Sequence, residues 1–365
     1  MTARASHLAA SSSLPRELHV LVPFWGLAGG VIKILDYAAH GADLGINVTL
    51  WAPPLPHASE PIFELPVAQR LLDDVNVTHR PLDELDLPQQ GSCVVLFTEP
   101  THHDLIEAVL REPLGEDLFH LIQGTRHANP TWQDGRNYRL LHRPMQRIAV
   151  TPQVFDAIAP IANQRYPITT ILEGHDVTWF GGRPQAPAGA TPRTSPLRVL
   201  YTTWKSDIGD RVADLLREDS RFAFVAIRQE VGWPALRKRY HGADIFLCAP
   251  GPEEGFYLPG LEAMAAGAAV VSAEVGGNRA YLRPGENAVL AEFDNAASHV
   301  DALTRLADDV SLQARLVKAG YGTIDAHTLA RERSEFASVL RSRKQSTGSA
   351  LTVAYDTNTA DLEAP

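Results

Sequence analysis

The sequence predicts an α/β protein built from two Rossmann-like, doubly wound domains in tandem. Short apolar runs alternate with longer helical patterns along most of the chain. Most of these runs are continuously apolar, which is typical of parallel strands that helices cover on both faces. A segment rich in proline, glycine and alanine, residues 181–196, interrupts the alternation before it restarts. This segment indicates a linker or a long surface loop.

The first domain is expected at residues 17–171. Its predicted strands alternate with helical patterns, of which residues 29–45 and 101–112 are examples. Alternation of this kind produces βαβ units and a parallel sheet. The predicted strands of this domain are residues 17–24, 46–51, 92–99, 117–124 and 147–152.

The second domain is expected at residues 172–324, with the same alternation. A last helical pattern, residues 325–343, follows the second sheet, and we expect it to pack back on the first domain. Residues 1–16 and 344–365 show no structural pattern, so they are predicted to be a disordered arm and tail. The predicted strands of this domain are residues 197–204, 221–228, 243–250, 268–274 and 287–293.

The composition is that of a globular enzyme. Of 365 residues, 45% are apolar and 21% are charged, and the net charge of −10 argues against nucleic-acid binding. Residues 1–16 lack the apolar stretch of a signal peptide, and no run reaches the ~18 apolar residues of a membrane-spanning helix. Cys93 and Cys248 lie in apolar runs, so we expect both in the core of a reduced, cytoplasmic protein.

Ligands of open α/β sheets bind in the loops at the carboxyl ends of strands, and two sheets that face each other would form a central cleft. The loop after the first strand places Gly29 and Gly30 before a helix. This suits a phosphate or an acceptor hydroxyl, with a tight turn as the alternative. The loop does not match G-x-G-x-x-G, so no dinucleotide site is predicted.

Arg126 and His127 stand at the end of the fourth predicted strand, which makes them candidates for catalysis or binding. A structural role for this histidine is equally open. His102, His103 and Asp104 also follow a strand, but neighbouring side chains on an extended segment point in different directions. We therefore interpret this trio as the start of a helix and predict no metal site.

Arg136, Arg139 and Arg143 have the spacing of one helix face. One hypothesis is a patch, together with Arg126, that contacts a phosphorylated acceptor or the anionic inner face of a membrane. The alternative is an ordinary solvated face.

In the second domain, Lys205 and Arg211 follow the first strand and are candidate partners for phosphate. A surface charge pair is the alternative for both residues.

The stretch EEGFYLPGLEAMAAG, residues 253–267, follows the strand at 243–250 and carries Pro259 where a helix begins. The backbone amides of Phe256, Tyr257 and Leu258 would lie near that helix start and suit a diphosphate.

Residues 254–271, EGFYLPGLEAMAAGAAVV, resemble the signature EGFGLPxLEAMAxGxPVV of retaining GT-B glycosyltransferases of family four (group 1). GGN at 276–278 and GEN at 285–287 also match segments of that family. LEGHDVTWF at 172–180 is similar to the element that marks the crossing into its second domain. The resemblance covers about residues 17–342 and implies the GT-B fold.

The resemblance also implies an activity: transfer of a sugar from a nucleotide diphosphate sugar to a hydroxyl of a glycan, lipid-linked sugar or natural product. It implies retained anomeric configuration and requires neither metal nor cofactor. Glu254 would contact the donor sugar and Glu262 the ribose. The roles that it implies for the remaining candidates are catalysis by His127 and Lys205, and donor binding by Gly255, Phe256, Tyr257, Leu258, Arg211, Arg228, Gly29 and Gly30.

Three positions depart from the family pattern. Ile208 stands where a phosphate-binding lysine is usual, Tyr257 where a glycine is usual, and Ala280 where many members have glutamate. Either Arg211 compensates for the missing lysine, or Lys205 and the backbone amides hold the diphosphate without it. Two other functions remain open, a sugar-nucleotide epimerase of the same fold and a non-catalytic subunit that binds a sugar nucleotide.

Overall fold

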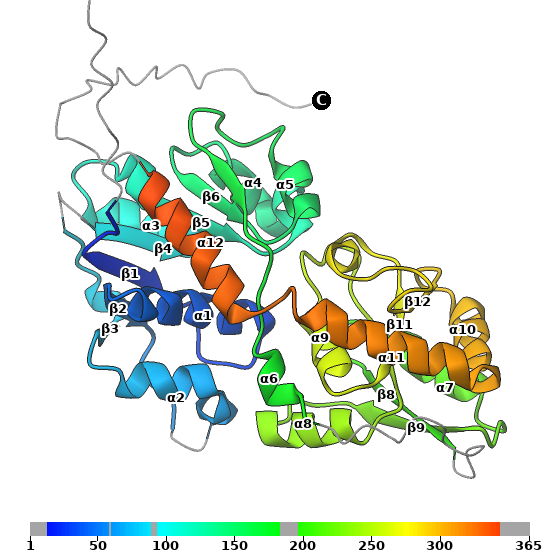
Figure 1. Cartoon of the computed structure of the whole chain (residues 1–365). Coiled ribbons are helices and arrows are strands. Elements are labelled where there is room, and N and C mark those ends of the chain that lie inside the picture. The colour runs from blue at the N-terminus through cyan, green and yellow to red at the C-terminus, as the bar shows by residue number, and fades with distance from the viewer. Residues whose placement is uncertain (1–12, 58–59, 89–92, 183–195, 344–365) are drawn as a thin grey trace, which may run out of the picture.

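The computed structural model describes residues 13–57, 60–88, 93–182 and 196–343. They form two α/β domains side by side, each built on an entirely parallel sheet (Figure 1). The predicted fold class is confirmed. The tail predicted at 344–365, most of the arm predicted at 1–16 and most of the linker lie outside the described residues.

Within the described residues, the first sheet has the strand order β3-β2-β1-β4-β5-β6-β7. The order reverses between β1 and β4, which is where such sheets bind ligands. The edge strands β3 and β7 were not predicted, because neither contains a buried apolar run. The strands are β1 Glu17–Leu21, β2 Asn47–Ala52, β3 Val77–Pro81, β4 Cys93–Phe97, β5 Leu118–Ile122, β6 Gln146–Ala149 and β7 Ile168–Thr170.

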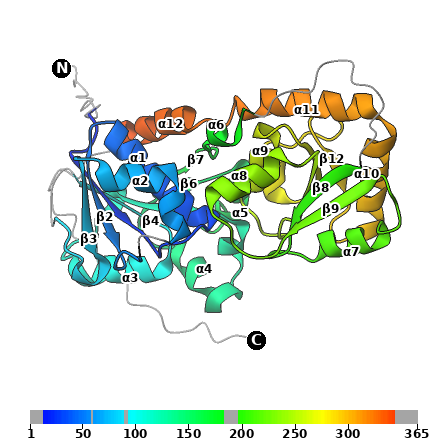
Figure 2. The same cartoon turned by 90° about the horizontal axis from the view of Figure 1, so that it is seen from below.

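The helices of the first domain connect these strands across both faces of the sheet (Figure 2). They are α1 Gly29–Asp43, α2 Pro66–Asp73, α3 Pro100–Val109, α4 Arg136–Leu140 and α5 Pro152–Ile158.

Helix α4 is shorter than the helix predicted at residues 135–143. The buried guanidinium of Arg147 takes the carbonyl groups of Leu140, Leu141 and Arg143. The amides of Leu141, His142 and Arg143 bond to carbonyls three residues back, so after Leu140 the chain tightens into turns that do not continue the α-helix. The interpretation of Arg143 as part of one helical face with Arg136 and Arg139 is therefore wrong.

The second sheet has the order β12-β11-β10-β8-β9, and each of its predicted strands is present. Its strands are β8 Leu197–Thr202, β9 Phe222–Ile227, β10 Ile245–Cys248, β11 Ala269–Ala273 and β12 Val289–Ala291. The helices around it are α6 Val177–Phe180, α7 Ile208–Leu215, α8 Trp233–His241, α9 Leu258–Ala265, α10 Ala296–Asp308 and α11 Val310–Ile324.

The chain crosses between the domains twice. After β7 it passes into the second domain, and after α11 it returns to form α12, Leu329–Ser342, which packs against α1 (Figures 1 and 2). The rings of Tyr37 and Phe336 meet edge to face at 4.9 Å between centroids. The two crossing segments also pair with each other, since His175 and Thr328 form a parallel β-bridge. A Cβ atom at Gly174 would lie 2.5 Å from the carbonyl oxygen of Thr328, so this pairing requires glycine.

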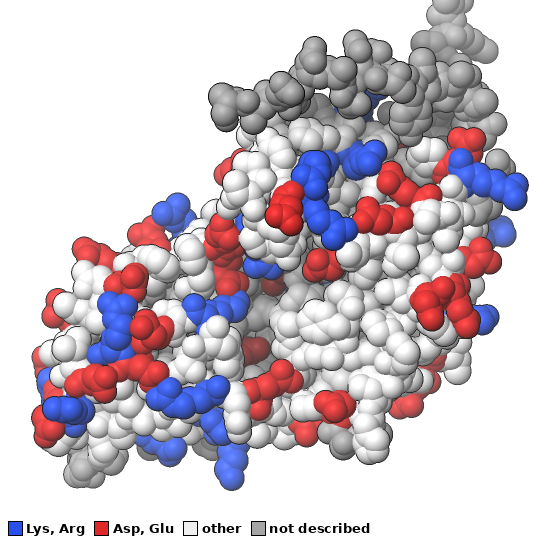
Figure 3. Space-filling model, turned by 180° about the vertical axis from the view of Figure 1, so that it is seen from behind, with Lys and Arg blue, Asp and Glu red and all other residues white. Residues whose placement is uncertain are grey.

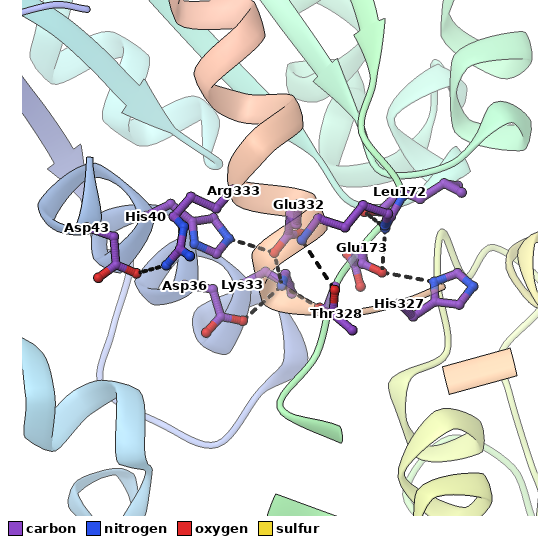
Figure 4. A network of polar contacts seen from close by, with 12 residues as sticks. Lys33, Asp36, His40, Asp43, Leu172, Glu173, His327, Thr328, Glu332 and Arg333 are labelled. Atoms are coloured by element: carbon purple, nitrogen blue, oxygen red, sulfur yellow. Dashed lines mark hydrogen bonds and ion pairs between the residues drawn. The ribbon is translucent and has the colours of Figure 1, made fainter. Parts of the chain in front are cut away.

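A buried ionic network surrounds the crossing (Figure 4). The Lys33 ammonium donates hydrogen bonds to Asp36 and Glu332, each at 2.8 Å, and to the carbonyl of Gly174 at 2.7 Å. His40 lies 2.9 Å from the same Glu332 carboxylate. The network therefore joins α1, α12 and the first crossing segment.

Carboxyl groups outnumber the lysine in this network, and burial disfavours their charged forms. Burial raises the pKa of Glu173 to about 8, and nearby Glu332, Asp36 and Glu254 add to the rise against the opposing effect of Lys33. Burial also raises the pKa of Asp36. The pKa of Glu332 is lowered, because Lys33 and His40 together outweigh its burial.

The core is continuous across the domain junction. One cluster of buried apolar residues includes Leu121 of the first sheet, Phe246 of the second and Phe336 of α12. Cys93 and Cys248 are both buried and unpaired, as predicted. In the part of the chain that the structure describes, every helix is too short or too polar to cross a lipid bilayer.

Candidate active site

The loop between β10 and α9 carries the sequence signature. The side chains of Phe256, Tyr257 and Leu258 are buried, so this loop offers mainly its backbone to a ligand. Pro259 lies in the first turn of α9, where its missing N–H costs nothing. Among the described residues, no side chain caps the N-terminus of this helix. Its first amides are therefore open to an anion.

This loop meets the loop after β5 of the first domain, backbone against backbone. Gly124 and Glu254 form an antiparallel bridge, and the Thr125 amide donates to the carbonyl of Glu253 at 3.3 Å. A Cβ atom at Gly255 would lie 2.3 Å from the carbonyl oxygen of Gln123. Glycine is therefore needed at the position after Glu254 for the domains to approach this closely.

Lys205 and Glu254 form an ion pair at this junction. The Lys205 ammonium also lies 5.5 Å from the centre of the Tyr257 ring, which places it over the aromatic face. Tyr257 is 1% exposed, and the face of its ring lies beneath the lysine ammonium. The structure thus brings three predicted site residues together, with a positive charge beside the open N-terminus of α9.

His127 is buried behind the bridge. Its Nδ1 lies 3.0 Å from the carbonyl oxygen of Gly124, so the neutral tautomer with its proton on Nδ1 donates a hydrogen bond to that oxygen. Burial lowers the pKa of His127 to about 4, despite the hydrogen bond to Gly124. The imidazole is therefore neutral near pH 7.

Arg126 lies beside His127, with its guanidinium 4.9 Å from the centre of the Trp132 ring. Its Nε is buried and lacks a hydrogen-bond partner among the described residues. Nearby Glu99 follows β4, and burial raises its pKa while Arg126 opposes the rise. The sequence interpretation missed Glu99, although its place at the carboxyl end of a predicted strand was a usable signal.

The N-terminus of α1 faces the same junction. Gly29 lies against Leu258, since a Cβ atom there would be 3.5 Å from the leucine methyl group. The Gln123 amide donates to the carbonyl of Gly30 at 3.2 Å. In the described part of the chain, α1 also lacks a side-chain cap. Two uncapped helix starts, from α1 and α9, therefore approach each other, and Figure 3 shows a hollow between the two lobes of the molecule.

Residues 208–309 match the family described as glycosyl transferases group 1. The matched segment lies within the second domain. A stretch of 83 residues is 39% identical to the D-inositol 3-phosphate glycosyltransferase of Thermomonospora curvata. This match covers 23% of the chain and 19% of the relative, so it spans about a fifth of that enzyme's length.

Solved structures of the GT-B fold resemble the chain over most of its length. Sucrose-phosphate synthase from Thermosynechococcus elongatus has a TM-score of 0.64 at 18% identity, covering 89% of this chain and 98% of its own. HepE of Anabaena, solved in complex with UDP-glucose, has a TM-score of 0.63 at 13% identity, covering 89% and 99%. The segment that matches the group 1 family therefore lies in the second of two domains with the GT-B fold.

Glu262 of the second domain is buried and already hydrogen-bonded. Its carboxylate accepts from Tyr240 at 2.8 Å and lies 3.0 Å from Nε2 of His175 in the first crossing segment. These contacts use two of the about four acceptor positions of a carboxylate. Ribose binding by Glu262 stays a prediction. His175 and Tyr240 were not among the predicted residues.

The two arginines predicted to bind the donor have acidic partners elsewhere in the second domain. Arg211 pairs with Asp294, and Arg228 makes two hydrogen bonds to Asp210, at 2.6 and 2.9 Å. Ile208 is 3% exposed within the core of the second domain. A lysine at position 208 would therefore be buried. Arg211, which was expected to meet phosphate, is paired with Asp294 instead.

The arginine patch of the first domain is partly neutralised. Arg136 pairs with Asp104 at 2.7 Å, and Arg143 lies 3.8 Å from Glu107. Arg139 donates to the carbonyl of Asp134 at 2.7 Å. Within the described ranges, no group of three His, Cys, Asp or Glu side chains is placed to hold a metal ion.

Proposed function

We infer that this protein is a retaining, metal-independent glycosyltransferase, which moves a sugar from a nucleotide diphosphate sugar to a hydroxyl acceptor. The observation that carries this inference is the Lys205–Glu254 pair beside the open start of α9. The Lys205 ammonium suits the diphosphate, and the Glu254 carboxylate suits the hydroxyls of the sugar. The acceptor class comprises glycans, lipid-linked sugars and small natural products.

In this proposal the donor diphosphate binds to the backbone amides at the start of α9 and to Lys205. Binding draws the ammonium toward phosphate and frees Glu254 to accept hydrogen bonds from the sugar. As the glycosidic bond breaks, negative charge grows on the leaving phosphate, and preorganised N–H groups and the cation stabilise it. Glu262, held by His175 and Tyr240, supplies its remaining acceptor positions to the ribose.

The acceptor hydroxyl approaches from the first domain, near α1 and His127. In a front-face mechanism the leaving phosphate takes the acceptor's proton, so no carboxylate nucleophile is needed, in contrast to retaining hydrolases. A neutral His127 fits this scheme, because it can accept a hydrogen bond without adding charge next to the sugar.

The match to a group 1 domain and the UDP-glucose complex of HepE support a nucleotide sugar as donor. We also propose a cytoplasmic location. Peripheral membrane contact through Arg126, Arg136, Arg139 and Arg143 is the weaker part of the proposal, because two of these side chains have acidic neighbours.

The test is incubation with a panel of UDP-, GDP-, ADP- and dTDP-sugars, with and without mixed acceptors, followed by mass spectrometry and NMR of the products. Glycosylated product with an α-linkage from an α-donor is expected. Glu254→Gln should abolish it, and Glu253→Gln, the matched control, should not.

Other outcomes would contradict the proposal. A changed sugar nucleotide formed without any acceptor would indicate an epimerase. Nucleotide-sugar binding without turnover across the panel would indicate a non-catalytic subunit, which the buried Ile208 makes the strongest competing hypothesis.

A further inference from the structure

A pocket of about 220 Å³ lies at the domain junction, outside the loops that carry Glu254, Lys205 and His127. Its walls come from both domains. Helices α1, α2 and α12 contribute residues such as Ala39, Val67 and Arg333, and the other side is formed by the first crossing segment and Trp233 of α8.

Several polar groups that line this pocket are almost completely buried. Asp36 is 4% exposed, His40 2% and His175 1%. Nε2 of His175 is engaged with Glu262, but its Nδ1 is buried without a hydrogen-bond partner among the described residues. A buried nitrogen without a partner is costly, so a ligand group that satisfies it would stabilise the protein.

The charges of the pocket favour a neutral ligand. The lining carries three carboxylates and two guanidinium groups. Asp36 pairs with Lys33 behind the pocket wall, and Asp176 caps the start of α6. Asp43 pairs with both arginines, which leaves no cation in excess for an anion (Figure 4 shows Arg333 with Asp43). A phosphate group would meet net negative charge here.

The same groups suit hydroxyls. Carboxylate oxygens and an imidazole nitrogen accept hydrogen bonds, the guanidinium groups donate them, and a hydroxyl does both. The Trp233 ring adds an apolar wall. The volume is below the ~300 Å³ at which pockets for drug-sized ligands begin, so a nucleotide sugar would not fit.

We propose that this pocket is a second binding site, for a neutral polyhydroxylated molecule of monosaccharide size. A molecule bound there would contact both domains at once. It would therefore stabilise the arrangement in which Gly124 meets Glu254, and it would touch His175, the direct partner of Glu262.

Binding is tested by saturation-transfer NMR and calorimetry on the full chain, with glucose, mannose, galactose and myo-inositol as probes. We expect at least one probe to bind and to raise the melting temperature. Val67→Phe fills the pocket from the partly exposed face of α2 and should weaken that binding at least tenfold. Leu72→Phe adds the same ring to an exposed position of the same helix outside the pocket and should leave it unchanged.

Three outcomes would overturn the proposal: no probe binds the wild-type protein, Val67→Phe binds as well as Leu72→Phe, or glucose 6-phosphate binds more tightly than glucose. Glu254→Gln separates this site from the proposed active site, because it should keep full monosaccharide binding. The binding readout needs no turnover, so a failed glycosyltransferase assay would leave it standing.

Discussion

Lys205 and Glu254 stand 49 positions apart and form an ion pair at the carboxyl ends of neighbouring strands, β8 and β10. The two side chains neutralise each other's charge. They lie beside the first backbone amides of α9, which no described side chain caps. The pair therefore keeps a cation at the start of α9 without a large local field. A diphosphate that binds Lys205 must therefore take the place of the Glu254 carboxylate.

Lys205→Met should lower kcat by about 10²-fold, because it removes a preorganised cation from the leaving phosphate. It should also leave Glu254 without its partner. The measurement is kcat and KM with the donor identified in the panel assay. Lys238→Met, an exposed lysine on α8, is the control. Equal rates for the two variants would exclude Lys205 from the reaction.

Ile208→Lys should destabilise the protein by several kcal/mol and should not improve donor binding, because the new ammonium would be buried without a partner. Chemical denaturation gives the free energy of unfolding, and calorimetry with UDP gives the affinity. Leu215→Lys introduces the same charge at an exposed apolar position of the same helix and should be tolerated. Tighter donor binding by the Ile208 variant would show instead that a lysine at this position can reach the diphosphate.

Glu332→Gln should cost about 3–5 kcal/mol in the free energy of unfolding, because it strips the buried Lys33 of a partner. Glu335→Gln breaks an i,i+4 pair with Arg331 near the surface and should cost less than ~1 kcal/mol. Denaturant titrations at pH 7 compare the two. Similar costs would show that the crossing network does not depend on charge.

Glu173 should make stability fall as pH rises. Its pKa is about 8 in the folded protein, above the ordinary value of 4.5, so the folded state holds the proton more tightly than the unfolded state. The stabilisation that comes from this proton is fully present below about pH 4.5 and is lost as pH rises through about 8. Melting temperatures of wild type and Glu173→Gln between pH 5 and 9 should converge at low pH and diverge at high pH, with the variant more stable. Parallel curves would contradict the shift.

His127 should remain neutral across the working pH range. Its pKa, lowered from 6.5 to about 4 by burial, predicts that its imidazole signals in NMR do not titrate between pH 8 and 5.5. Below about pH 6.5 the unfolded chain takes up a proton on His127 that the folded protein does not. The free energy of unfolding should therefore fall only below that pH. A midpoint near 6.5 in the NMR titration would show that the ring is solvated.

The sequence was sufficient to predict the core of both sheets, because their central strands are continuous apolar runs. It was insufficient for β3 and β7, whose residues are partly exposed at a sheet edge and carry no such signal. The prediction for helix α4 was too long because the spacing of its arginines does not reveal that the chain tightens into turns after Leu140.

For the candidate site, the signature located Glu254 and the loop after β5 located His127, since both follow predicted strands. Side-chain partners were beyond prediction. Arg211 and Arg228 pair with Asp294 and Asp210, and nothing in their spacing distinguishes those partners from a phosphate. The Lys33–Glu332 pair joins residues 299 positions apart, which only the return of α12 explains.

The return of α12 also sets an order of events during synthesis. Lys33 and Asp36 leave the ribosome early, but Glu332, which completes their network, follows only after the whole second domain. Domains usually mature one after another from the N-terminus. Here the earlier domain is finished by the last helix, so a nascent chain halted within the second domain would expose the unfinished surface of α1. Such a chain is a ready substrate for chaperones.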